Sequence, residues 1–447
     1  MSQKLVLVGC GSANLFAALY LMSHGFDPKD ITIIEAGSEP ATRTSMLKGF
    51  AGAGLKSDGK FVFSLFQDPL SKHISDEEKA SYYSSVQSIM EDFLEIPESG
   101  ISNPSDEDEL NKVMCSMDSK WGMDSLTLRQ STVWHIGTDN ELIMAINMYK
   151  YMVGAGVNFM LKTEVTDIDF DNKTISYLSP GRKSGITTYD KLQIGVGKVG
   201  VDFVDTLVKK YSIDIDPGYA NVGGRFETKC SDVIKKFADD IQYDFKFLQK
   251  YGENDQFEIR SFCTCNYSAY VIEEGINGVR TYNGHAYGKN HEKENGMTNF
   301  GVIARIKDVD AQAFHKAVLS KYGKEGCVIR GENWDGTSTI TKVGREISWV
   351  ELSSMYSGIA GAVGDQLVIY LWDFIKRMNN IFGMNGNWSY YIPEIKMATG
   401  VINTDRNYRM ADGRYPDVSW VGDSCSGSVG IVPAAITGVR GIESLVK

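Results

Sequence analysis

The N-terminal part of the chain has an apolar pattern that changes from strand-like to helical and back. Residues 4–8 (KLVLV) are a short aliphatic run of the kind found in buried parallel strands. Residues 15–26 carry apolar side chains at helical spacing, and a second strand pattern follows at 30–37. This order predicts a βαβ unit, in which a right-handed helical crossover joins two parallel strands.

Later segments return to the same alternation of strands and helices. Residues 138–171 read as a helix, a glycine-containing turn and a strand, and residues 174–179 as a further strand. Residues 191–200 form a strand pattern that runs into glycines, and residues 363–378 show clear helical spacing. Residues 417–447 read as a strand, a glycine-rich turn and a terminal helix. The chain is therefore predicted to be an α/β protein.

The composition is that of a globular, acidic protein. The 447 residues are 43% hydrophobic and 23% charged, with a formal net charge of −11. Because neutralising phosphates needs clustered Lys and Arg, we expect no nucleic-acid partner for a chain this acidic, although its overall charge does not exclude a local basic patch. No run of about 18 apolar residues is present, so we expect no membrane-spanning helix. Seven scattered cysteines argue against a disulfide framework and favour a cytoplasmic location.

The turn after the first strand fits a dinucleotide-binding motif. Gly9 and Gly11 occupy the first two positions of G-x-G-x-x-G, where glycine permits a tight turn and lets the backbone approach a pyrophosphate. Asn14 stands at the third position, which normally holds glycine. Glu35 ends the second strand about 20 residues on, where a carboxylate accepts ribose hydroxyls. The order predicts a dinucleotide site; the alternative is a chance glycine turn.

A second glycine-rich turn near the C-terminus indicates which dinucleotide is bound. The segment VGDSCSGSVGI (421–431) lies between a strand and the terminal helix, and its Asp423 can hydrogen-bond a ribityl hydroxyl. The helix that begins near Gly430 presents a positive dipole end, which stabilises negative charge on a reduced flavin. FAD is the predicted cofactor. The alternative is an Asp-Ser turn that caps the last helix.

The separated α/β segments predict one discontinuous domain and an insertion. We expect a Rossmann-like FAD-binding domain built from residues 1–65, 130–200 and 395–447. Residues 201–394 have a mixed pattern and are expected to form an inserted α+β substrate or cap domain. Residues 66–129 are expected to be a mainly helical excursion. The active site should then lie between the two domains, at the carboxyl ends of the parallel strands.

Several segments fall in one order along nearly the whole chain and resemble a known family. They are GCGSANLFAALYL (9–21), Glu35, FAGAGLKSDGKF (50–61), HIGTDNEL (135–142), VGGRFET (222–228), FCTCNYSAYVI (262–272) and VGDSCSGSVGI (421–431). Together they resemble the uncharacterised FAD-dependent "NAD(FAD)-utilizing" dehydrogenases, which are relatives of the two-dinucleotide-binding-domain flavoproteins. The family's FCxCPGG motif stands here as FCTCNYSA, without the proline and both glycines.

The resemblance implies a set of cofactor-binding residues. Those expected to hold the ADP half of FAD are Gly9, Gly11, Ser12 and Glu35, with Asn14 of the glycine motif and the turn at Gly195 and Gly197. Those expected along the pyrophosphate and ribityl chain are Ser57, Asp58, Gly59 and Lys60. Val165 is expected to contact adenine, and the residues expected to meet the ribityl chain and flavin ring are Gly422, Asp423, Gly430 and Ile431.

Cys263, Cys265 and His285 are the candidate catalytic residues. Side chains two apart in a strand face the same side, so both thiols are expected to line one pocket wall. The alternative is two small core residues. The resemblance places His285 in the substrate region, where it could act as a base; an ordinary hydrogen-bonded histidine is the alternative. A single C-x-C pair predicts no metal site.

These features together predict an FAD-dependent oxidoreductase. It would transfer a hydride or two electrons between a small organic substrate and the flavin. NAD(P)H or oxygen is the expected redox partner, and no membrane partner is expected. The alternative is a non-catalytic FAD-binding protein whose cap domain binds a partner.

Overall fold

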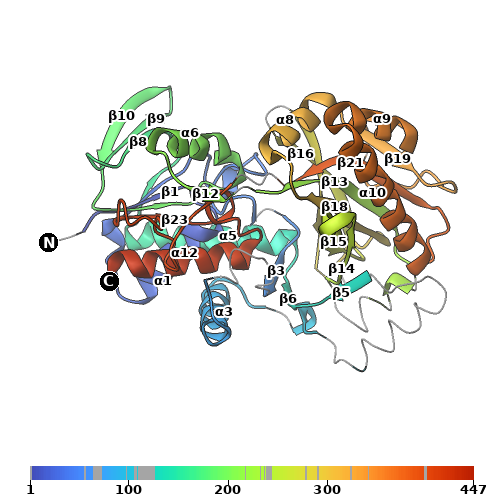
Figure 1. Ribbon diagram of the computed structural model, residues 1–447. Helices are drawn as coiled ribbons and strands as arrows, with labels where there is room; N and C mark the ends of the chain where they lie inside the picture. The colour runs from blue at the N-terminus through green and yellow to red at the C-terminus, as the bar shows by residue number, and fades with distance from the viewer. Residues whose placement is uncertain are drawn as a thin grey trace.

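The computed structural model covers most of the chain. It describes residues 3–54, 57–63, 73–96, 98–104, 108, 126–216, 218–231, 233–235, 237, 244–276, 279–288, 291–322, 325–340, 342–396 and 400–447. Much of the predicted excursion at 66–129 therefore lies outside the described residues. Figure 1 shows two lobes side by side, with both chain termini on the same lobe. Among the described residues, no helix is long and apolar enough to cross a membrane.

The first lobe is built on a five-stranded parallel sheet. Its strands, in spatial order, are β23 (Val418–Trp420), β11 (Lys191–Ile194), β1 (Leu5–Val8), β2 (Ile31–Ile34) and β7 (Asn158–Met160). Every residue of β1 and β2 is buried, which explains why these strands read as continuous apolar runs. The predicted βαβ unit is confirmed, with α1 (Ser12–Ser23) as its crossover helix.

The two faces of the parallel sheet carry different layers. Leu5 and Leu7 point to the side covered by α1, α3 (Asp76–Glu91), α5 (Thr138–Ala155) and α12 (Ile431–Val446). Val6 and Val8 point to the other side, which is covered by α6 (Val201–Tyr211) and the antiparallel strands β8 (Glu164–Asp169) and β9 (Thr174–Ser179); β10 (Lys183–Thr188) pairs with β9 at the edge of this small sheet. Because successive side chains of a strand point to opposite faces of the sheet, β1 contributes to a separate hydrophobic core on each face.

The second lobe is an eight-stranded sheet with helices on one face (Figure 1). In spatial order the strands are β20 (Arg345–Glu346), β19 (Cys327–Arg330), β21 (Trp388–Ile395), β13 (Ala220–Lys229), β18 (Met297–Ile306), β15 (Phe257–Cys265), β14 (Lys246–Tyr251) and β5 (Leu126–Arg129). Its core includes residues of α8 (Ala311–Tyr322), α9 (Trp349–Ala360) and α10 (Ala362–Ile381). The predicted class, a Rossmann-like α/β domain with an inserted α+β domain, is confirmed.

Smaller elements complete the described fold. They are the hairpin β16 (Ala269–Ile276) and β17 (Val279–Ala286), the sheet of β3 (Lys60–Phe63), β6 (Thr132–His135) and β4 (Ile101–Ser102), the pair β12 (Ile215–Asp216) and β22 (Val401–Ile402), the short helix α11 (Asp423–Ser426), and five 3₁₀ turns, Pro28–Asp30, Pro40–Thr42, Glu98–Gly100, Lys198–Gly200 and Glu253–Asp255.

The strand pairing corrects the predicted segment boundaries at two points. Residues 126–129 were expected in the helical excursion, but they form β5, the edge strand beside β14 in the large sheet. Residues 201–211 were expected in the cap domain, but they form α6 and contribute Val204 and Leu207 to the core beside the parallel sheet. In both cases the segment belongs to the lobe that supplies its long-range packing partner, and the local apolar pattern does not show which lobe that is.

Candidate functional site

A cavity of about 410 Å³ lies where the carboxyl ends of the parallel strands meet the second lobe. Its volume is in the range of ligand sites, which is roughly 300–1,000 Å³. The predicted site residues that line it are Gly9, Gly11, Ser12, Glu35, Ser57, Asp58, Lys60, Val165, Gly195, Gly197, Cys263, Gly422, Asp423, Gly430 and Ile431. The predicted residues that do not line it are Asn14, Gly59, Cys265 and His285.

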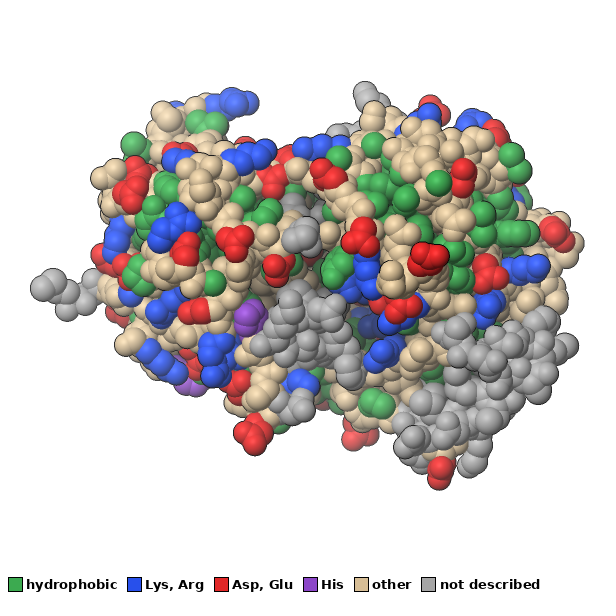
Figure 2. Space-filling model, in the orientation of Figure 1, with side chains coloured by type: hydrophobic (Ala, Val, Ile, Leu, Met, Phe, Trp, Pro, Cys, Tyr) green, Lys and Arg blue, Asp and Glu red, His purple; other side chains and the backbone are tan. Residues whose placement is uncertain are grey.

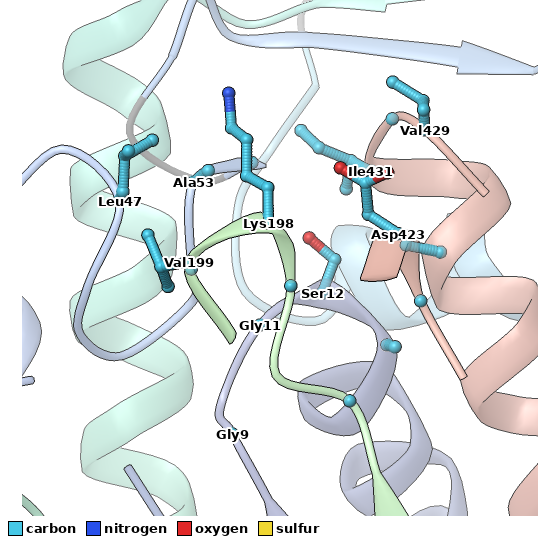
Figure 3. Close-up of a pocket in the computed structure, with 18 of the residues that line it drawn as sticks. Gly9, Gly11, Ser12, Leu47, Ala53, Lys198, Val199, Asp423, Val429 and Ile431 are labelled. Carbon is cyan, nitrogen blue, oxygen red and sulfur yellow. The ribbon is translucent and has the colours of Figure 1, made fainter. Parts of the chain in front are cut away.

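Two helices begin at this cavity. Gly11 and Ser12 stand at the start of α1, and Gly430 and Ile431 at the start of α12 (Figure 3). Helix N-termini offer backbone N–H groups and a positive dipole end to a bound anion. A Cβ atom placed on Gly11 would meet no atom within 4 Å, and Gly11 has an ordinary φ of −76°. The backbone at Gly11 is therefore open to close approach by a ligand.

Asn14 stabilises the glycine turn through hydrogen bonds to its backbone. The Asn14 Nδ2 donates to the carbonyl oxygens of Val8, at 2.9 Å, and Gly9, at 2.8 Å. Its Oδ1 accepts a hydrogen bond from Gln193 Nε2 at 3.1 Å. Asn14 is fully buried and does not line the cavity, so the geometry favours a supporting role, and its contact with the cofactor stays a prediction. A side chain in place of the third glycine is tolerated here because it satisfies the strand-end carbonyls.

Glu35 lines the cavity, but most of its hydrogen-bonding capacity is used by the protein. Its Oε2 accepts from the backbone N–H of Cys10 at 2.8 Å. Its Oε1 accepts from the backbone N–H groups of Gly37 at 2.8 Å and Gly49 at 3.0 Å. A carboxylate has about four acceptor positions. About one position is therefore left for a ribose hydroxyl, where the sequence predicted room for two.

The loop at residues 57–60 places a buried ion pair at the cavity. The Lys60 Nζ lies 3.0 Å from Asp58 Oδ2, and both side chains are buried. Burial acts to raise the pKa of Asp58, but Lys60 outweighs it and lowers that pKa to about 2. His135 lies behind the pair, with Nε2 3.0 Å from the Asp58 carbonyl oxygen. Burial and the Lys60 ammonium lower the pKa of His135 to about 3, so its ring is neutral.

Glu141 fixes the same loop and was not singled out from the sequence. It lies in the first turn of α5, and its Oε2 accepts from the backbone N–H of Ser57 at 2.9 Å. Gly59, with φ +71°, packs directly against the backbone of Gly137, so it shapes the loop without lining the cavity. The only sequence signal for Glu141 was its place in the segment HIGTDNEL, where an acid follows a glycine at a helix start.

The two cysteines of the C-x-C pair do not share one wall. The pairing of β15 with β18 shifts register between Phe262 and Cys265, and Cys263 has φ +47°. This β-bulge breaks the alternation on which the prediction rested. Cys263 lines the cavity, whereas Cys265 is fully buried with its Sγ 3.4 Å from Lys60 Nζ. Burial raises the pKa of both thiols, that of Cys265 to about 12.

His285 lies one step away from the cavity. In the β16–β17 hairpin it is opposite Tyr270, on the same face as Asn283 and Glu274. Asn283 and Glu274 line the cavity, and His285 does not. Its role as a catalytic base therefore stays a prediction, and the cavity geometry does not favour it.

Polar groups from both lobes meet at the cavity wall. The Lys198 Nζ lies 3.9 Å from Glu274 Oε2, and Glu274 Oε1 accepts from Asn283 Nδ2 at 2.8 Å. Figure 3 shows Lys198 extending from the loop after β11, across from Asp423. Burial raises the pKa of Asp423 to about 6, against the opposite effect of Lys198 and Lys396. A carboxyl group that titrates near neutral pH can both donate and accept hydrogen bonds.

The comparisons with known proteins give distant structural similarity only. No protein-family model and no curated protein matches this sequence. Similar solved structures include a flavoprotein/dehydrogenase from Cytophaga hutchinsonii, with 11% identity, a TM-score of 0.42, and coverage of 99% of this chain and 78% of that chain. A glycine oxidase from Geobacillus kaustophilus has 10% identity, a TM-score of 0.41, and coverage of 99% and 94%. Because these TM-scores are below 0.5, the function proposed below rests on the site's own geometry.

Proposed function

We propose that this chain is an FAD-dependent oxidoreductase acting on a small organic substrate. One observation carries the proposal: a single cavity holds, along its length, the Glu35 carboxylate, the open backbone at Gly11 and a second helix start at Gly430. The first two suit the ribose and pyrophosphate of a dinucleotide. The third suits an electron-accepting ring on which negative charge develops.

The residues present fit FAD part by part. Glu35 has an acceptor position left for a ribose hydroxyl, and the first N–H groups of α1 would face the pyrophosphate. Asp423 would hydrogen-bond the ribityl chain, and the start of α12 would face the flavin ring. When bound, FAD supplies hydride and two-electron chemistry, while the protein supplies binding, orientation and electrostatics.

The protein's own groups would orient the substrate and exclude water. The second lobe contributes Phe262, Cys263, Asn283 and other residues to the cavity wall, so a ligand there lies between the two lobes. Lys198 and Glu274 are two polar groups of the described wall that could hold a substrate proton or hydroxyl. NAD(P)H or oxygen as redox partner, and a cytoplasmic location, stay predictions from the sequence.

The cofactor is tested by releasing it and by blocking its place. Heat or acid should release from the purified protein a compound that chromatographs as FAD. Gly11→Val should fold, because a Cβ there meets no protein atom, but should weaken FAD binding about 30-fold or more. This corresponds to roughly 2 kcal/mol of lost charge-assisted hydrogen bonds. A colourless protein that ignores added FAD would contradict the proposal.

A matched control separates folding from binding. Gly154, an exposed glycine of α5, also has open space around its Cβ position, so Gly154→Val should leave FAD affinity unchanged. If Gly11→Val and Gly154→Val bind FAD equally well, the pyrophosphate does not lie at α1.

Anaerobic mixing with NADH, NADPH, amines and hydroxy acids then tests catalysis, since bleaching of the flavin by any of them supports an enzyme.

A further inference from the structure

Charged side chains of both signs line the cavity where the two lobes meet. Lys198 and Asp423 come from the first lobe, and Glu274 and Lys396 come from the second. Figure 2 shows Lys and Arg side chains beside Asp and Glu side chains along the line between the lobes. A ligand at this wall meets hydrogen-bond donors next to acceptors, so the placement of single groups decides what binds.

The hairpin that carries Glu274 is fixed to the large sheet. Gly284 of β17 packs so closely against the side chains of Arg225 and Asn299 that any side chain there would collide with them. The Asn283 Nδ2 donates to Glu274 Oε1 at 2.8 Å, and the Asn283 Oδ1 accepts the backbone N–H of Gly284 at 2.9 Å. Oε1 of Glu274 therefore has a fixed partner, and Oε2 is the oxygen left for a ligand.

Lys198 approaches that oxygen from the first lobe without bonding to it. The Lys198 Nζ lies 3.9 Å from Glu274 Oε2, whereas a charge-assisted hydrogen bond is about 2.7–2.9 Å long. In the part of the chain that the structure describes, neither atom has a hydrogen-bond partner. Figure 3 shows the Lys198 side chain extending away from Gly11 and across from Asp423. A donor and an acceptor are thus both left open at one point of the cavity.

Both groups are charged at neutral pH, which fixes their hydrogen-bonding roles. Burial acts to raise the pKa of Glu274, but Lys198 and the Asn283 amide outweigh it and hold that pKa below its ordinary value of 4.5. Burial acts to lower the pKa of Lys198, but Glu274 and Asp423 keep that pKa above its ordinary value of 10.5. An ammonium only donates hydrogen bonds, and a carboxylate only accepts them. A ligand group between the two must therefore accept from Lys198 and donate to Glu274.

A hydroxyl group fits the space between Lys198 and Glu274, because one oxygen atom both accepts and donates. Hydrogen bonds of about 2.8 Å from the ammonium and about 2.6 Å to the carboxylate, meeting at a near-tetrahedral angle, span about 4.4 Å. The gap of 3.9 Å needs to open by about 0.5 Å, which the flexible stem of Lys198 allows. A protonated amine in this place would face the Lys198 ammonium, and a carboxylate would face that of Glu274, so like charges would repel either group.

We propose that Lys198 Nζ and Glu274 Oε2 bind one hydroxyl group of the substrate between them, and that the substrate is a neutral alcohol and not an amine. This inference deepens the proposed function and rests on it. Turning an alcohol into a carbonyl compound removes the hydroxyl proton, which Glu274 Oε2 is placed to accept, and a hydride from the adjacent carbon; hydride chemistry is what FAD supplies when bound. Alkyl amines, like a lysine side chain with its ordinary pKa of about 10.4, are protonated at neutral pH and do not fit this place.

The proposal is tested with three probes that share one aromatic body. The hydroxyl of benzyl alcohol donates and accepts, the oxygen of benzyl methyl ether only accepts, and benzylamine is a cation. Their affinities are measured by ligand-observed NMR titration of the purified protein with its FAD. Benzyl alcohol should bind at least tenfold more tightly than either of the other two. Equal or tighter binding of the ether or the amine would overturn the proposal.

Two variants should change the preference in different ways. In Glu274→Gln, the Asn283 Nδ2 keeps the amide oxygen at the Oε1 position, so an NH₂ donor replaces the acceptor at Oε2. Benzyl alcohol and benzyl methyl ether should then bind within about twofold of each other. In Lys198→Met the cation is gone, and the ratio of the benzyl alcohol affinity to the benzylamine affinity should fall at least tenfold. If either variant keeps the wild-type ratios, the assignment is wrong.

Control variants distinguish this pair from the general charge of the cavity. Lys48 and Glu164 are exposed residues that line the same cavity. Lys48→Gln and Glu164→Gln should therefore keep both ratios of affinities. If these controls change the ratios as much as Lys198→Met and Glu274→Gln do, the overall charge selects the ligand and the proposal is wrong. Unchanged thermal midpoints in Lys198→Met and Glu274→Gln would show that their altered ratios do not reflect unfolding.

The same samples separate this proposal from that of the cofactor. FAD content and FAD affinity are measured for every variant. A protein that neither contains nor binds FAD, but prefers benzyl alcohol through Lys198 and Glu274, would refute the cofactor and keep the hydroxyl site. A protein that contains FAD but lacks the preference would do the reverse. If Lys198→Met and Glu274→Gln weaken FAD binding and leave the probe ratios unchanged, the hydroxyl between them belongs to the ribityl chain, and the proposal is wrong.

Discussion

Replacing Glu141 with glutamine should make the stability of the protein less dependent on pH. The Glu141 side chain is fully buried, and its Oε2 accepts from the backbone N–H of Ser57. Its Oε1 has no hydrogen-bond partner among the described residues. Burial, reinforced by the nearby negative charge of Asp58, raises the pKa of Glu141 well above its ordinary value of 4.5.

The sign of the effect follows from proton binding. Above pH 4.5 the unfolded chain loses the Glu141 proton, while the folded protein keeps it until the pH reaches the raised pKa. The folded state thus binds more protons, and the free energy of unfolding falls by about 1.4 kcal/mol per pH unit in that window. Glutamine is neutral at every pH, and its amide oxygen can still accept from Ser57. The free energy of unfolding of Glu141→Gln should therefore rise relative to that of the wild type by about 1.4 kcal/mol for each pH unit between 4.5 and the raised pKa.

Urea unfolding at a series of pH values from 5 upward, followed by tryptophan fluorescence, measures the difference directly. The neighbouring Asp58 and His135 are present in both proteins, so their titrations largely cancel in the difference. Glu141→Ala should be about 2–4 kcal/mol less stable than Glu141→Gln at every pH, because it leaves the Ser57 N–H without its acceptor and opens a small void. Glu294→Gln, on an exposed glutamate, controls for the loss of one charge. Parallel curves for wild type and Glu141→Gln would refute the reasoning.

Two further predictions concern the framework of the site. Glu35→Ala should destabilise the cofactor-free protein by about 3–6 kcal/mol, because three backbone N–H groups each lose an acceptor at about 1–2 kcal/mol, and it should also weaken FAD binding. Thermal melts of the protein without FAD measure this loss of stability. The control is Glu164→Ala, which replaces an exposed glutamate that lines the same cavity. Equal melting temperatures of Glu35→Ala and Glu164→Ala would contradict the prediction. Gly438→Val should lower the melting temperature by several degrees, because a side chain there collides with the Ala13 backbone where α12 crosses α1. Unchanged melting would mean that the two helices can separate without cost.

Local patterns determined the half of the molecule that holds the glycine turn. Gly9, Gly11 and Glu35 follow a strand, a turn and a helix within one short segment, and each of these elements has its own period of apolar residues. A βαβ unit of this kind has one favoured handedness, so its sequence order also fixes where its turn lies. For that reason the cavity end formed by these residues could be located before the fold was known.

Pairing between distant strands decided what local patterns could not. Leu126–Arg129 belongs to the second lobe only because β14, more than a hundred residues later, offers its edge. Cys263 and Cys265 separate because β18 opposes them with a shifted register, and alternation holds only in a regular strand.

The residues of the candidate site also fall into those that local patterns predict and those that only strand pairing and lobe packing bring together. The glycine turn, the acid that follows β2 and the returning turn at Asp423 could be found without a fold, since each depends on neighbours in the chain. Only the tertiary structure brought Lys246, Arg260 and Glu274 to the same cavity as Asp423. Isolated charges on strands carry no local signal of their partners, because such side chains usually stay on the surface. Their convergence is a property of how two lobes meet, which no single segment encodes.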